Sequence, residues 1–178
     1  MTHINQHALM SAVNLNDIES VRIMLHRDTT TWNPDDVLCF ACQKGRLEIV
    51  QLLIGVANPN AHDGRPLQMA VGNGYYEVVK FLLPHCDATV LRSEALQMSV
   101  LNADVVMFDM LYPHSDCATA LGELEISIQE MPSDYKYDEC QKLHARLIDI
   151  VNIQKQNAAL RAAVEHSHAR APNLLRKI

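Results

Sequence analysis

The stretch from Pro66 to Leu83 reads PLQMAVGNGYYEVVKFLL and contains two short apolar patterns, one on each side of Gly72-Asn73-Gly74. From Leu67 to Gly74, apolar or small residues recur at i, i+3, i+4 and i+7, and a similar stripe follows in the second half. This spacing places the residues on one face of a helix. A glycine between the stripes can adopt positive φ and end the first helix. The stretch therefore predicts a hairpin of two helices.

The hairpin recurs along the chain with a period of 29 residues. One column of the repeat contains only leucine, a second contains small residues, and a third lies at the predicted turn between the helices. A fixed period of this kind predicts a solenoid, in which each unit buries its apolar face against its neighbours. We therefore expect an all-α fold. The three columns are Leu9, Leu38, Leu67, Leu96; Ala12, Ala41, Ala70, Ser99; and Asn16, Gly45, Gly74, Ala103.

At these residues the chain resembles the ankyrin repeat family. PLQMAV at 66–71 is similar to the family motif T-P-L-H-x-A, and GYYEVVKFLL at 74–83 is similar to its second helix. KGRLEIVQLLIGVANPNA at 44–61 is also close, and the resemblance covers about residues 5 to 116. It implies an ankyrin-type helix-hairpin solenoid, but a 29-residue period is shorter than the usual period of about 33. We therefore expect the inter-repeat loops to be short.

A second departure from the family concerns the His of T-P-L-H. Its column holds Met10, Cys39, Gln68 and Gln97, so the hydrogen bonds that this His usually makes must differ here.

The regular period ends near residue 116. PHCDAT at 84–89 recurs as PHSDCAT at 113–119 with one additional residue, which shifts the phase of the later residues. We expect residues 1–116 to form four repeats. Residues 117–178 are expected to form a degenerate fifth helix pair that caps the solenoid, with an extended second helix and a frayed tail, since solenoids need a terminal unit with a polar outer side.

Composition limits the classes of partner. The chain has 178 residues, 15 Lys and Arg against 21 Asp and Glu, and no basic cluster, so nucleic acid is not expected as a partner. No window reaches the roughly 18 apolar residues that cross a bilayer, so a membrane partner is not expected. Five cysteines without a secretory signal indicate reduced thiols. We expect a cytoplasmic protein, with delivery into a host cytosol as the alternative for a bacterial source.

Candidate catalytic patterns are weak. Gly72-Asn73-Gly74 lacks the Gly-Lys-Ser/Thr ending of a phosphate loop, and no nucleophile or zinc-protease motif is present. Cys39 and Cys42 have redox or zinc spacing, but the second cysteine pair of a zinc site is missing. We expect no enzymatic activity, no metal and no cofactor.

The resemblance implies a protein-binding surface instead. In ankyrin repeats, the residues just before the inter-helix glycine line the concave face and contact partners. The residues implied as first contacts are Gln43, Lys44, Asn73, Leu101 and Asn102. Phe40, Met69 and Met98 either form an adaptable apolar strip for a partner or pack between repeats. We expect a non-catalytic interaction module: an adaptor, inhibitor or effector.

An alternative function rests on the C-terminal helix. Ile153, Asn157, Leu160 and Val164 form a heptad-like seam with one polar position, which is a pattern of self-association. The seam covers fewer than three heptads, so a monomer is expected rather than a dimer.

Overall fold

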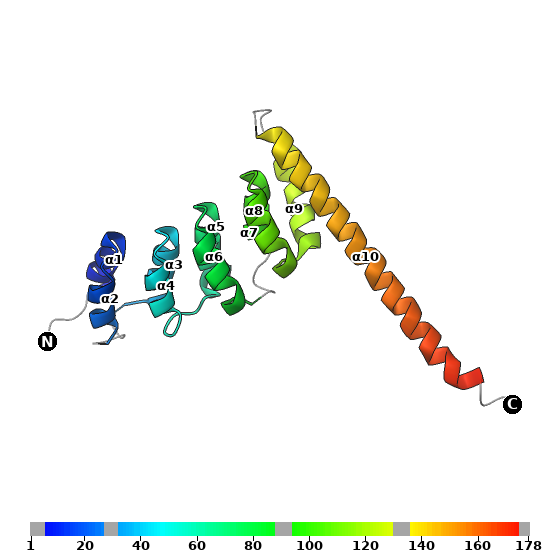
Figure 1. Cartoon of the computed structure of the whole chain (residues 1–178), viewed down its shortest axis with the longest axis horizontal. Helices are drawn as coiled ribbons and strands as arrows, with labels where there is room; N and C mark the ends of the chain where they lie inside the picture. Colours follow the sequence, from blue (N-terminus) through cyan, green and yellow to red (C-terminus); the bar gives the residue numbers. More distant parts are fainter. Residues whose placement is uncertain (1–5, 27–31, 88–93, 130–135, 175–178) are drawn as a thin grey trace.

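The computed structural model describes residues 6–26, 32–87, 94–129 and 136–174, with side chains up to residue 165. These residues form ten α-helices and two short 3-10 turns, and they contain no strand. The expected all-α fold is confirmed. Figure 1 shows the helices as successive pairs stacked from the N-terminus, with one long helix crossing the end of the stack.

The first eight helices form four pairs, and the last two form a fifth. First helices pack on the next first helix along the stack, from α1 through α3, α5 and α7 to α9, while α2, α4 and α6 form an outer row. The helices are α1 (Gln6–Leu15), α2 (Ile18–Leu25), α3 (Pro34–Gln43), α4 (Leu47–Leu53), α5 (Ala61–Gly72), α6 (Tyr76–Leu82), α7 (Glu94–Leu101), α8 (Val105–Leu111), α9 (Cys117–Gln129) and α10 (Tyr137–Leu174). The 3-10 turns η1 (Leu83–His85) and η2 (Tyr112–His114) follow α6 and α8.

Left-handed backbone at one column of the repeat separates the helices of each of the first four pairs. The φ values are +58° at Asn16, +65° at Gly45, +70° at Gly74 and +56° at Ala103. This conformation ends an α-helix at little steric cost for glycine and at a higher cost for alanine. The predicted role of Gly74 and its equivalents is confirmed.

The starts of α3 and α5 are set by local backbone and side-chain chemistry. The Asn33 side chain accepts a hydrogen bond from the backbone N–H of Asp35, and Pro34 occupies the first turn of α3. In α5, the backbone is left-handed from His62 to Gly64, so the regular helix begins just before Pro66. Ser93, which directly precedes Glu94 in the sequence and is of a residue type common at N-caps, lies outside the described residues.

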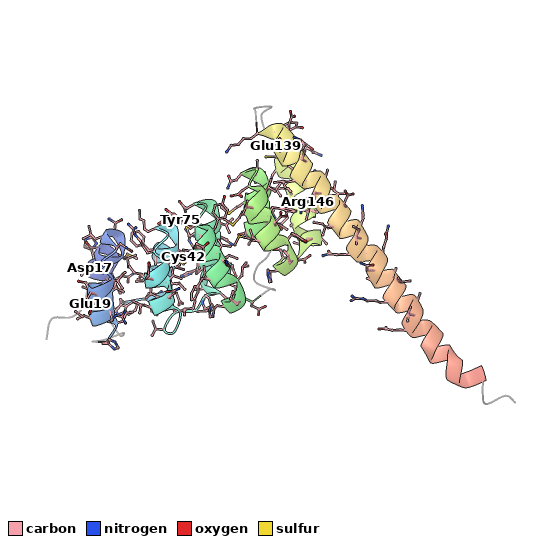
Figure 2. All side chains as sticks on the ribbon, viewed as in Figure 1. Asp17, Glu19, Cys42, Tyr75, Glu139 and Arg146 are labelled. Carbon is pink, nitrogen blue, oxygen red and sulfur yellow. The ribbon has the colours of Figure 1, made fainter. Side chains whose placement is uncertain are left out.

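The core is a continuous aliphatic layer between the two rows of helices. The four leucines of the repeat column, from Leu9 to Leu96, are at most 1% exposed. Figure 2 shows Cys42 inside the stack, where it belongs to the same core cluster. Trp32 is also buried there, in a segment that the repeat pattern does not cover.

The long helix α10 packs on the end of the stack only through its first part. Leu143, Leu147 and Val151 are buried against the preceding helices. Arg146 forms an ion pair of 2.7 Å with Asp109 of α8, and it is labelled at this junction in Figure 2. Every side chain from residue 152 to residue 165 is exposed. The helix therefore projects beyond the repeats, as Figure 1 shows.

Candidate functional site

A hollow of about 440 Å³ opens on the surface formed by the first helices of the first three pairs. Its apolar wall comes from Met10 on α1, from Cys39 and Phe40 on α3, and from Met69 on α5. Its volume falls in the range of about 300–1,000 Å³ that is common for ligand pockets. We call the surface of α1, α3, α5 and α7 that bears it the first-helix face. The polar residues of the hollow are Asp36, Gln43, His62 and Arg65.

The acidic group of the hollow is held by two neighbours. One carboxylate oxygen of Asp36 accepts a hydrogen bond of 3.4 Å from the Gln6 amide, and the other lies 3.2 Å from Nε2 of His62. The contact with His62 becomes an ion pair when the imidazole is protonated. Asp36 thus has contacts of its own within the fold.

The cationic groups beside the hollow lack acidic partners. The exposed Arg65 guanidinium forms no ion pair or hydrogen bond with any residue that the structure describes. The Lys44 ammonium lies 5.3 Å from the centre of the Phe40 ring, and within the described ranges it has no carboxylate partner either. Two cations without an ion-pair partner among the described residues, Arg65 and Lys44, therefore lie at or beside a hollow that also contains the Asp36 carboxylate.

The predicted contact residues divide between the hollow and the rest of the first-helix face. Phe40, Gln43 and Met69 line the hollow. Asn73 is exposed, and its side-chain amide donates a hydrogen bond of 2.7 Å to the backbone oxygen of Met69. Lys44 lies beside the hollow, over the ring of Phe40.

The other predicted contacts belong to the fourth repeat. Asn102 is exposed and Leu101 is half-buried. The backbone oxygen of Leu101 accepts a bond of 3.5 Å from the Cys140 thiol of α10. Met98 packs between repeats: a Cβ added to Gly72 would lie 2.6 Å from its terminal methyl.

The three apolar side chains for which the sequence left two roles open all take part in packing. Phe40, Met69 and Met98 are all half-buried and pack against the core. Phe40 and Met69 also line the hollow, whereas Met98 is not among its lining residues in the described part of the chain. Phe40 and Met69 thus pack against the core and also reach the surface at the hollow, and their contact with a partner stays a prediction.

A polar link between repeats was not predicted from the sequence. The Gln68 amide donates a hydrogen bond of 2.6 Å to the Glu94 carboxylate of the next repeat, and Gln97 donates one of 2.5 Å to Glu123. Gln68 and Gln97 stand in the column where the family motif has His. The signal was present in the sequence, since both acids also share one column of the 29-residue period.

Thiol chemistry is disfavoured by burial. Loss of solvent raises the pKa of the Cys39 and Cys86 thiols to about 11 and raises the pKa of Cys42 further. A nucleophilic or metal-binding cysteine needs the thiolate, so these cysteines are poorly suited to either role at neutral pH. Within the described ranges, no group of three or more His, Cys, Asp and Glu side chains could hold a metal ion.

These features define a helical repeat solenoid whose first-helix face bears a hollow and in which burial raises the pKa of the Cys39, Cys42 and Cys86 thiols. Residues 9–93 match the family model for ankyrin repeats, in three copies. This region of the chain therefore belongs to the ankyrin repeat family. Members of this family are general protein–protein interaction modules and are typically non-catalytic.

No curated protein matches the chain. Among the described residues, no helix is both long enough and apolar enough to span a membrane.

Proposed function

We propose that this chain is a non-catalytic adaptor, inhibitor or effector that binds a protein partner through its first-helix face. The observation that carries the proposal is the hollow of about 440 Å³, which lies on the face that ankyrin repeats commonly use and includes the predicted contacts Phe40, Gln43 and Met69. Aromatic and methionine side chains at a partly buried surface repack readily around a partner. The partner is a protein whose identity the fold does not specify.

The proposal includes an arrangement of the whole chain. Residues 1–116 act as four binding repeats, and residues 117–178 act as the cap of the solenoid. The chain works as a monomer in the cytoplasm, an environment that suits its five free thiols.

A paired substitution on the first-helix face tests the proposal. The full chain and the variant Lys44→Glu with Asn73→Arg would serve as baits for affinity capture from a source-cell lysate, with quantitative mass spectrometry. Lys44 and Asn73 are the C-cap residues of α3 and α5 and do not belong to the core, so the thermal unfolding midpoint of the variant should stay within a few degrees of that of the wild type. The partner captured by the wild type should be lost from the variant.

The control for this test lies on the outer row of helices. Gln51 on α4 and Lys80 on α6 are exposed, and the pair Lys80→Glu with Gln51→Arg makes the same two kinds of charge change as the test pair. We expect this control to retain the partner. Equal capture by all three baits would show that the first-helix face is not the binding surface.

A second candidate function is self-association through α10. The observation that favours it is the exposure of Ile153 and Leu160, at 55% and 64%, on a part of the helix that has left the stack. Light scattering of the full chain, with and without Ile153→Asp and Leu160→Asp, separates the two candidates. Self-association predicts a dimer that these substitutions dissociate, whereas the first proposal predicts a monomer in both cases.

A further inference from the structure

The first-helix face is closed by side-chain links at one end and open at the other. Each link starts at the residue in the His position of the T-P-L-H motif. It ends at an acid of the next repeat that stands three residues before the same position there, as in Gln68 to Glu94 and Gln97 to Glu123. The same two positions hold Met10 and Asp36 between the first two repeats, and they hold Cys39 and Arg65 between the next two.

Neither N-terminal pair can form the link. A thioether has no donor for a carboxylate, and an arginine has no acceptor for a thiol. All four side chains of these two pairs line the hollow. The hollow thus lies at the two register positions where the amide–carboxylate link is missing.

Without these links, the hollow presents apolar side chains and one arginine at the surface. The wall is formed by two methionines, a phenylalanine and a cysteine, which suits a bulky apolar side chain. Asp36 is engaged by Gln6 and His62, whereas Arg65 has no acidic partner among the described residues. A guanidinium presents paired donors that match a carboxylate, so a partner acid beside the apolar side chain would complete its contacts.

We propose that the hollow takes a protein segment with a large apolar side chain flanked by Asp or Glu, and that Arg65 selects the acid. This inference rests on the proposed function and assigns its contact point to the first three repeats. Lys44, on the same face, offers a second cation to an acidic segment. The linked fourth repeat, including Leu101 and Asn102, contributes less.

A displayed library of random twelve-residue peptides, selected on the immobilised full chain, provides a defined probe. We expect the enriched peptides to contain a large apolar residue with an acid within about three positions. For a selected peptide, Arg65→Glu should weaken binding about 10-fold to 100-fold, the loss of one charged hydrogen-bonding contact. Lys80→Glu, an equal charge reversal on the outer helix α6, should leave binding unchanged.

A second variant introduces the missing link, so that the charge change at Arg65 is accompanied by a new hydrogen-bond donor at Cys39. Cys39→Gln with Arg65→Glu copies the Gln68–Glu94 pair into the open register. We expect this variant to fold with an unfolding midpoint no lower than that of the wild type and to lose the peptides. Gln68→Ala, which removes a link outside the hollow, should retain them.

The outcomes separate this inference from the proposed function. In one outcome, Lys44→Glu with Asn73→Arg abolishes peptide binding, but the peptides show no acidic preference or still bind Arg65→Glu. This outcome would overturn the inference and leave the first-helix face as the binding surface. Peptides that are insensitive to all these variants would overturn both. Failure to enrich any motif on the wild type would also contradict the inference.

Discussion

The two halves of the first-helix face have the same backbone arrangement and differ in their side-chain links. In the C-terminal half, Gln68 and Gln97 bind acids of the following repeat. In the N-terminal half, Met10 and Cys39 occupy the same column and border a hollow. The difference indicates that the constant columns of the repeat maintain the stack, while the residues in one variable column determine whether a side-chain link closes the surface or a hollow remains.

Two phenylalanines give the largest expected contrast between a residue of the core and a residue of the hollow. Phe108 is 0% exposed, and its ring lies 5.7 Å from that of Tyr112. Phe108→Ala should lower the free energy of unfolding by about 3–5 kcal/mol, because it leaves a cavity. Phe40→Ala, at a half-buried position, should cost about 1–2 kcal/mol by loss of buried area. Urea denaturation measures both, and equal losses would contradict the distinction.

Two turn glycines give the next contrast. Both have positive φ, at which alanine costs about 1–2 kcal/mol. A Cβ on Gly45 would also lie 2.5 Å from the Tyr75 ring, whereas one on Gly74 meets no neighbour within 4 Å. Gly45→Ala should therefore destabilise the chain more than Gly74→Ala in urea denaturation. Adding Tyr75→Ala should remove the excess, and an excess that persists would show that the ring contact is not its cause.

The side-chain link itself should have a small effect on stability. Gln68→Ala removes the hydrogen bond to Glu94 at a partly exposed site, so we expect a loss of about 0.5–1 kcal/mol. Cys39→Ala at the equivalent open position removes no such link. A double-mutant cycle with Glu94→Ala should give a coupling energy of the same size, and zero coupling would mean that the link contributes nothing.

The thiols of Cys39 and Cys86 should affect stability only in alkali. The pKa of Cys39 and Cys86 is about 11 in the folded chain, against an ordinary value of 9.0. The unfolded chain therefore loses these protons first, and stability should be unaffected below pH 9 and should fall between pH 9 and pH 11. The urea midpoint followed from pH 7 to pH 11 measures this. Cys39→Ser with Cys86→Ser should reduce the fall, and an identical fall would assign it to other groups.

The sequence predicted the repeat because its signals are local. The leucine and alanine columns and the turn at Gly74 each act within one hairpin, and the structure confirms them. The links between repeats were not predicted, because Gln68 and Glu94 are 26 residues apart and stand in different columns. Their pairing depends on the offset between adjacent helices, which the period alone does not give.

The candidate site was predicted in part for the same reason. Phe40, Gln43 and Met69 were identified from their position before the turn, and they line the hollow. Arg65 and His62 were not identified, since they come from the start of α5. Their approach to α3 depends on a left-handed backbone at three successive residues, and only one of these is glycine.

Amide hydrogen exchange of the full chain with a selected peptide bound tests the central claim most directly. The account predicts new protection on α1, α3 and α5, at residues 6–15, 34–43 and 61–72, and no change on α10. Protection confined to α10 or to the outer helices α4 and α6 would contradict it.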